Sequence, residues 1–338
     1  MRRFILEGPR QLLEAADSVH EALSSLGSVE GRVVLAGMGG SALGGGIVEA
    51  LSILTGRPPR GRFSVARDYS LHLPVGPGDL VVAISWSGET EETLSTYQEA
   101  VRSGAGVVVV ASGGRLLELA RRDAGRGVLS IVPPPQPPGF QPRFSLWFTT
   151  GVLLRLIEQL GLVLRGPDAP SLVASLEGAM GQAEVRGREI AASLEARIPV
   201  VYSSAALETA VARIWRIKLQ ENAKIPAVSG AFPEANHNEL IGFDPSFRGL
   251  FAFLLLPDPW APPRVHERFR LFEELMCETG YPCVIEPLRG DDPLEAIFQS
   301  LLLADWVSFS LAALRGVDPV DIPLIQNFKA RLGRGPAQ

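Results

Sequence analysis

The stretch LVVAISWSGETEETL, residues 80–94, begins with a short apolar run, continues through Ser and Gly, and ends in a segment whose first residues are acidic, as at the start of a helix. Leu80–Ile84 is predicted to be a buried strand, and Thr90–Arg102 the helix that follows it. The earlier stretch VVLAGMGGSALGG, residues 33–45, has the same order of strand, Gly- and Ser-rich loop, and helix. Repetition of this order is typical of βα units around a parallel sheet.

The strands and helices predicted around these stretches make two α/β units. In the first half, further strands are expected at Arg32–Ala36, Phe63–Ala66, Val107–Val110 and Val128–Val132, with helices at Ala42–Leu54 and Arg115–Arg122. The Pro-rich stretch 133–142 ends this unit, because repeated Pro excludes helix and central strand, and a long helix is expected over Arg143–Leu160. In the second half we expect strands at Pro199–Tyr202, Leu250–Leu256 and Cys283–Glu286, and helices at Ala205–Asn222, Val265–Thr279, Pro293–Leu314 and Pro323–Leu332.

Both Gly- and Ser-rich loops have the residues of an anion site. Glycine lets the backbone approach a ligand, and the N-terminus of a helix presents unpaired amides beside the positive end of its dipole. Hydroxyl donors stand in the same loops, at the carboxyl ends of strands, where open α/β sheets bind ligands. In either loop alone, the Ser, Thr and Gly residues could equally be ordinary helix caps. Two such loops at adjacent strand ends favour a phosphate site. The predicted phosphate-binding residues are Gly39, Gly40, Ser41, Ser85, Ser87 and Thr90.

Composition and charge exclude several classes. The chain has 338 residues, of which 46% are hydrophobic and 20% charged, with a formal charge of −5. This balance offers no basic field for nucleic acid, and no apolar run approaches the ~20 residues of a membrane span. The start lacks the long apolar core of a signal peptide. We therefore expect a cytoplasmic protein that binds neither nucleic acid nor membrane.

Cysteine, histidine and lysine are scarce. Cys277 and Cys283 are the two cysteines, and together with four histidines they form no metal-ligand spacing, so we expect no metal and no cofactor. A disulfide between the two cysteines stays open, although two buried thiols are favoured by the usual burial of cysteine. Among 32 basic residues the lysines are Lys218, Lys224 and Lys329 alone.

With the motif Ser85-x-Ser87-Gly88-x-Thr90 and Gly39-Gly40-Ser41 ahead of it, the chain resembles sugar isomerase (SIS) domains. Over nearly its whole length it resembles the bifunctional phosphoglucose/phosphomannose isomerases. This resemblance implies two flavodoxin-like SIS domains, with parallel sheets flanked by helices, at residues 1–142 and 143–338. It further implies interconversion of glucose 6-phosphate and mannose 6-phosphate with fructose 6-phosphate through a cis-enediol, in a homodimer.

The resemblance also assigns the chemistry to residues. The block QENAKIP, residues 220–226, carries Glu221, which in the family is the base that moves the proton between C1 and C2. His237, in EANHN, and Lys329 match the ring-opening residues, and Arg143 matches the arginine that stabilises the enediolate. Lys224 is expected to be structural.

The family's His enters the partner subunit's site, and the Gly- and Pro-containing stretch 229–233 is compatible with a loop that projects toward a partner. Phe232, Phe243 and Phe247 would then supply apolar contact, or else fold back onto their own core.

Three other classes of protein fit the sequence less well. A sugar-phosphate-binding SIS module without catalysis usually has one lobe and an appended DNA-binding domain, and no basic segment is appended here. A glutamine-dependent glucosamine-phosphate synthase needs an N-terminal Cys nucleophile, yet no Cys precedes Cys277. A zinc phosphomannose isomerase needs clustered His ligands, and the four histidines of this chain are scattered. An aldose–ketose isomerase therefore remains the favoured function, and the non-catalytic module is the alternative.

Overall fold

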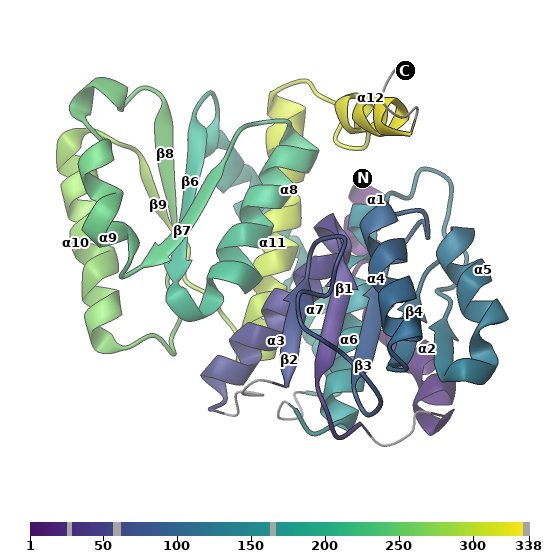
Figure 1. Cartoon of the computed structure of the whole chain (residues 1–338). Coiled ribbons are helices and arrows are strands. Elements are labelled where there is room, and N and C mark those ends of the chain that lie inside the picture. The colour runs from purple at the N-terminus through teal and green to yellow at the C-terminus, as the bar shows by residue number, and fades with distance from the viewer. Residues whose placement is uncertain (26–28, 57–61, 163–166, 334–338) are drawn as a thin grey trace.

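A computed structural model describes residues 1–25, 29–56, 62–162 and 167–333. It contains two parallel sheets, each covered by helices on both faces (Figure 1). The fold class predicted from the sequence is confirmed. The strands are β1 (Val33–Gly37), β2 (Phe63–Ala66), β3 (Leu80–Ile84), β4 (Gly106–Val110), β5 (Val128–Ile131), β6 (Ile198–Ser204), β7 (Val228–Phe232), β8 (Phe251–Leu256) and β9 (Cys283–Ile285).

The first sheet has the order β2-β1-β3-β4-β5, which is the flavodoxin-like order. Its inner strands are apolar along their whole length because helices cover both faces, as β1 and β3 illustrate with every residue buried. The helices of this half are α1 (Arg2–Glu7), α2 (Gln11–Ser25), α3 (Leu43–Leu54), α4 (Glu91–Arg102), α5 (Gly114–Arg122) and α6 (Leu146–Gln159). The predicted strands and helices of this half are found within a few residues, whereas α1 and α2 were not expected.

The second sheet has the order β7-β6-β8-β9. Its helices are α7 (Ala169–Leu194), α8 (Arg213–Ala223), α9 (Ala235–Asn238), α10 (Pro263–Thr279), α11 (Pro293–Leu314) and α12 (Pro323–Leu332). Three-residue 3-10 turns and one π-helical turn, η5 (Glu208–Ala212), lie between them. Helix α7, the short helix α9 and strand β7 were not predicted.

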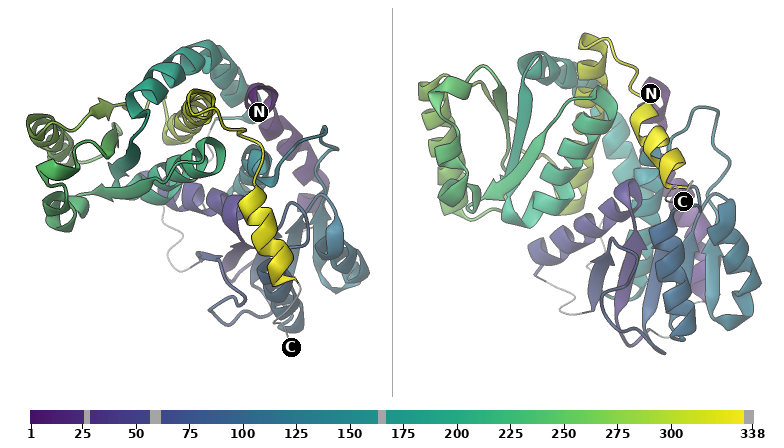
Figure 2. Two further views of the ribbon diagram at one scale, coloured as in Figure 1. Left: turned by 90° about the horizontal axis from the view of Figure 1, so that it is seen from above. Right: turned by 45° about the horizontal axis from the view of Figure 1, so that its top comes forward.

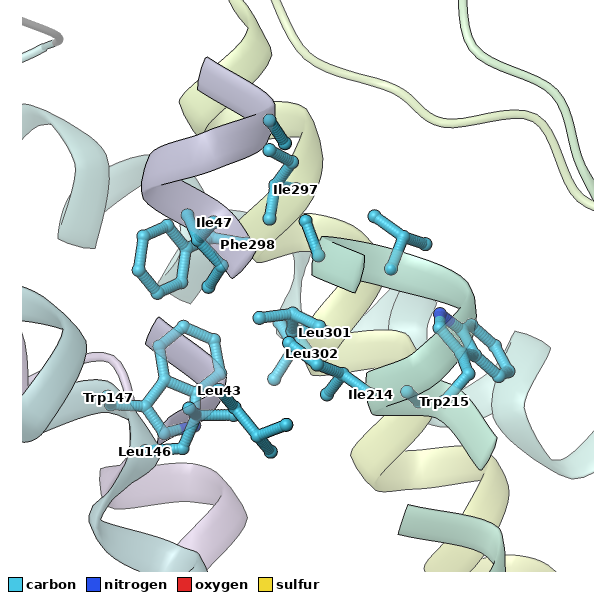
Figure 3. Close-up of a cluster of buried hydrophobic side chains, with 14 of the residues drawn as sticks. Leu43, Ile47, Leu146, Trp147, Ile214, Trp215, Ile297, Phe298, Leu301 and Leu302 are labelled. Carbon is cyan, nitrogen blue, oxygen red and sulfur yellow. The ribbon is translucent and has the colours of Figure 1, made fainter. Parts of the chain in front are cut away.

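The two halves share one core at their junction. Side chains from α3, α6, α8 and α11 interdigitate there (Figure 3), and they include Ile47, Trp147, Trp215 and Phe298. Gly46 of α3 lies against the Thr209 carbonyl of η5, where an added Cβ would come within 2.7 Å of that oxygen. The halves are therefore packed tightly enough to hold loops of the first sheet beside the end of α8.

Helix α11 is the centre of this core. It is 22 residues long and apolar enough to cross a membrane, contrary to the expectation that no apolar run approaches such a length. The structure gives the reason: 72% of the apolar window is buried inside the molecule, as the helix packs against α7 and α8. An all-round apolar helix of this kind is expected at the core of a large protein.

A different layer covers the opposite face of the second sheet. There α10 packs on β6 and β8 through an aromatic cluster with Tyr202, Phe253, Phe269 and Phe272. Helix α9 lies on the same side, so α9 and α10 are separated from α8 and α11 by the sheet (Figure 1). Helix α12 stands apart, beyond the end of α11 and toward the first half (Figure 2).

Candidate active site

The two predicted phosphate loops lie side by side, because their strands pair. β1 and β3 are neighbours, and Gly37 is opposite Ile84 in their register. The first loop then turns through Gly39–Ala42 into α3. In the second, the buried Ser85 hydroxyl donates to Thr90 Oγ1 at 2.9 Å, and Thr90 stands at the N-cap position of α4. Ser41 is half-buried and Ser87 exposed, so the hydroxyls and two helix N-termini meet at one edge of the sheet.

Gly88 is required by the shape of the second loop. Its φ is +71°, a left-handed conformation that L side chains rarely adopt, and an added Cβ would lie 2.0 Å from the Gly113 carbonyl oxygen. The neighbouring chain after β4 therefore packs directly on this loop. Ser112 also donates from its hydroxyl to the Trp86 carbonyl at 2.6 Å. The loop is consequently a rigid element, suited to hold a fixed anion geometry.

Arg143 is brought against the first loop by the turn that follows the Pro-rich stretch. This 3-10 turn, Pro142–Ser145, passes Gly40 so closely that an added Cβ there would be 3.5 Å from the Arg143 Cα. The Arg143 side chain is 11% exposed. Its Nε donates to Asn222 Oδ1 at 3.0 Å, and its Nη2 donates to the carbonyls of Pro319 and Val320 at 2.6 and 2.8 Å. Arg143 thus joins the first half to α8 and to the segment before α12.

Glu221 lies in the last turn of α8, as predicted, and faces Arg143. Its Oε2 is 3.9 Å from the Arg143 Nε, and the side chain is 28% exposed. Gly40, Arg143, Glu221 and Asn222 are among the residues that line a cavity of about 20 Å³, which has room for one water molecule. Removal from water raises the pKa of Glu221, and the charges of Arg143, Lys218, Lys224 and Lys329 partly oppose this. The result is a carboxylate with enhanced basicity among cations.

Lys224, Lys329 and Arg143 all place positive charge near the Glu221 carboxylate. Lys224 has φ +54° at the C-cap of α8 and donates from Nζ to the Glu221 carbonyl, which supports the structural role expected of it. Lys329 is exposed on α12, and its charge still acts on Glu221. Burial lowers the pKa of Arg143. The structure therefore brings together Glu221, Arg143 and the first phosphate loop, whereas Lys329 acts on Glu221 only through its charge.

Lys218 is a part of this surrounding that sequence reasoning did not assign. Its Nζ lies 2.5 Å from Asp305 Oδ1 of α11, with side chains 9% and 7% exposed. Asn222, which holds Arg143, in turn donates to the Ser308 hydroxyl at 3.0 Å. The scarcity of lysine was a usable signal for Lys218, whereas nothing local marks Asn222. These contacts fix the end of α8 against α11 and thereby the position of Glu221.

His237 is not brought to Glu221 by the fold of this chain. It is exposed on α9, which lies across the second sheet from α8 (Figure 1). The expectation of a projecting loop over residues 229–233 is wrong, because residues 229–232 belong to the edge strand β7, which pairs with β6. Phe232 is fully buried against Phe269, and Phe243 packs on Phe253, so both belong to their own core, while Phe247 is 45% exposed.

Cys277 and Cys283 are both free in the structure. Cys277 is exposed and Cys283 half-buried, so the prediction of two buried thiols is wrong for Cys277, which faces outward from α10. Burial and the neighbouring Cys277 raise the pKa of the Cys283 thiol. Among the described residues, no cluster of three or more His, Cys, Asp or Glu side chains could hold a metal ion.

Two parallel sheets flanked by helices, paired Ser- and Gly-rich loops and a half-buried carboxylate are the features expected of a sugar-phosphate protein of the SIS class. The family model described as "Bacterial phospho-glucose isomerase C-terminal SIS domain" matches residues 184–332. Among solved structures, a putative phosphosugar isomerase from Clostridium difficile 630 aligns over 95% of this chain and 94% of its own, with a TM-score of 0.70 and 15% identity.

Curated relatives narrow the class. The bifunctional phosphoglucose/phosphomannose isomerase of Aquifex aeolicus is 34% identical over 89% of this chain and 90% of its own length. That of Thermoplasma acidophilum is 30% identical over 98% of this chain and 99% of its own. The chain belongs to the bifunctional phosphoglucose/phosphomannose isomerase family.

Proposed function

We propose that this protein interconverts glucose 6-phosphate and mannose 6-phosphate with fructose 6-phosphate through a cis-enediol. The observation that supports this most is the position of Glu221. This carboxylate, whose pKa is raised by burial, lines the same small cavity as Gly40 of the first phosphate loop and the cations Arg143 and Lys218. Aldose–ketose isomerisation needs a base over C1 and C2 and positive charge for the enediolate. The names of the curated relatives point to the same reaction.

Each residue has a role in this proposal. The amides and hydroxyls of Gly39, Gly40, Ser41, Ser85, Ser87 and Thr90 bind the phosphate. Glu221 removes the proton from C2 of the aldose and returns it to C1, and the reverse holds for the ketose. Arg143, 3.9 Å from that carboxylate, stabilises the enediolate oxygen. The cavity beside Glu221 is only about 20 Å³, which is too small for a sugar phosphate, so the sugar lies outside this cavity and beside the phosphate loops.

Ring opening needs a group that exchanges a proton with the ring oxygen, and His237 with Lys329 fills this role. His237 is exposed on the far side of the second sheet from Glu221. The active form is therefore a homodimer in which each His237 acts on the sugar bound at the other subunit's Glu221. The division at residues 142 and 143 into two SIS domains and a cytoplasmic location belong to the same proposal.

Turnover distinguishes this proposal from the alternative, a module that binds sugar phosphate without catalysis. The purified protein is incubated with fructose 6-phosphate in D2O, and the aldoses are analysed for deuterium at C2. We expect glucose 6-phosphate and mannose 6-phosphate that carry deuterium there, because the enediol exchanges its proton with solvent. Binding of fructose 6-phosphate without product would establish the non-catalytic module instead.

The base is tested by Glu221→Gln, which keeps the shape of the side chain and removes its basicity. We expect turnover to fall by at least about a hundredfold, the usual contribution of a positioned base, with substrate binding largely kept. Glu208→Gln is the matched control, an exposed glutamate at the start of the same helical segment. Near-normal turnover of Glu221→Gln would remove Glu221 from the mechanism.

A mixing experiment tests the exchange of His237 between subunits. Subunits with Glu221→Gln and subunits with His237→Ala are co-expressed at equal levels. Half of the randomly formed dimers are then mixed, and each mixed dimer has one intact site of two, so about a quarter of wild-type activity is expected. If dimers exchange but no activity returns, His237 acts in its own subunit.

A further inference from the structure

Helix α12 has an apolar stripe that nothing in the described chain covers. Leu324, Phe328 and Leu332 are 82%, 66% and 52% exposed, and no residue of α12 is buried. Their spacing of four places all three on one face of the helix. Isolated helices of this length are marginal in water, and most helices in proteins are stabilised by packing of an apolar face. The α12 stripe (these three residues) therefore calls for a surface to pack against.

The start of α12 is already held beside the active site. Arg143 Nη2 binds the carbonyls of Pro319 and Val320, a few residues before the helix begins. Lys329 follows Phe328 directly, so it lies at the edge of the stripe, and its charge acts on Glu221. Whatever packs on the α12 stripe is consequently placed next to Lys329 and close to the reacting part of the site.

A second exposed surface has matching properties. Residues 233–247, here called the His237 segment, carry Glu234, Glu239 and Asp244 and no Lys or Arg. Within it Ile241 is 91% and Phe247 45% exposed. Helix α12 has the opposite charge, with Lys329 and Arg331 and no acidic residue. Each surface thus combines exposed apolar side chains with charges that complement those of the other.

Within one subunit these two surfaces cannot meet, because α9 lies beyond the second sheet while α12 lies toward the first half (Figures 1 and 2). We propose that the α12 stripe of one copy packs on the His237 segment of a second copy. Two-fold symmetry makes the contact reciprocal, so one dimer buries both stripes. The inference rests on the proposed function for the role of His237, and it names the surface that delivers this residue beside Lys329.

The contact is tested by chemical cross-linking between two kinds of subunit. Both carry Cys277→Ser and Cys283→Ala, so that each retains a single introduced cysteine. Phe328→Cys subunits with a purification tag are mixed with untagged Ile241→Cys subunits and treated with a short bismaleimide. We expect a covalent pair of unequal subunits. Absence of that product in a mixture shown to exchange subunits would overturn the proposal.

The matched control replaces the Ile241→Cys subunit with Ile53→Cys, a residue 58% exposed on α3 that belongs to neither surface. Equal cross-linking from Ile53→Cys would also overturn the proposal, because the reaction would then be non-specific. Cross-linking does not depend on turnover. If the protein proved not to be an isomerase, the cross-linking result would still stand, and if cross-linking failed, the isomerase activity would still stand.

Dimer affinity supplies a second measurement. Leu324→Ser with Phe328→Ser should raise the dimer dissociation constant, measured by sedimentation equilibrium, by at least about a hundredfold, since two large apolar side chains leave the interface. No residue of α12 is buried, so the double variant leaves the core intact. Ile53→Ser should leave the dissociation constant unchanged. A monomeric wild-type protein, or a double variant that dimerises normally, would refute the contact.

Discussion

Replacing Lys218 with methionine should destabilise the protein strongly. The Lys218 Nζ is 2.5 Å from Asp305 Oδ1, with the two side chains 9% and 7% exposed. Methionine has similar length but no charge, so Asp305 stays buried without its cation. Breaking a buried pair by removal of one partner costs about 3–5 kcal/mol. We expect the free energy of unfolding to fall by that amount, measured by urea denaturation with linear extrapolation.

Two further variants make the reasoning refutable. Lys218→Met combined with Asp305→Leu removes both charges and should recover most of the loss, because a buried pair replaced by apolar residues is often neutral in stability. Arg188→Met is the exposed control. Its pair with Glu184 has side chains 59% and 25% exposed and should be worth less than about 1 kcal/mol. If Lys218→Met costs no more than Arg188→Met, the interpretation of Lys218 as a buried anchor of α8 is wrong.

Three other outcomes are expected. Burial raises the pKa of Glu221, so the acid limb of the pH profile of kcat/KM should lie at a higher pH than that of an ordinary glutamate. Lys329→Met should move this limb to a still higher pH, because a cation that lowers the pKa of Glu221 is lost. An acid limb that Lys329→Met leaves in place would contradict this. Activity should survive prolonged treatment with a chelator, and loss that zinc or manganese reverses would contradict the proposed mechanism. Gly88→Ala should lower the free energy of unfolding by at least about 1–2 kcal/mol from its left-handed backbone and raise KM for the sugar phosphate, whereas Gly125→Ala, a glycine with open space for a Cβ, should do neither.

Much of the fold was predictable because its first half follows local rules. Buried strands such as β1 and β3 are continuous apolar runs, and each ends in a Gly- and Ser-rich loop that starts a helix. The same rules predicted that Glu221 ends a helix. They failed for β7, whose Gly230 and the following Pro233 favour a loop in sequence, whereas pairing with β6 and burial of Phe232 make it a strand.

The candidate site was predictable in its residue types and only partly in its assembly. Arg143 and Glu221 are far apart in the chain, and the hydrogen bond from Arg143 to Asn222 at the end of α8 holds them together. Lys218 gave only a compositional signal, since its partner Asp305 is distant in sequence. The separation of His237 from Glu221 could not be predicted from the residues, because it depends on which face of the sheet α9 covers.

The bonds of Arg143 to the carbonyls of Pro319 and Val320 bear on how kinetic data for this residue are interpreted. Any truncation of Arg143 releases the tether of the C-terminal helix together with the charge, so a slow variant mixes lost electrostatics with a displaced Lys329. Added guanidinium ion separates the two contributions: it replaces the cation without replacing the covalent link. The fraction of activity that it restores to Arg143→Ala therefore measures the charge, and the remainder measures the tether.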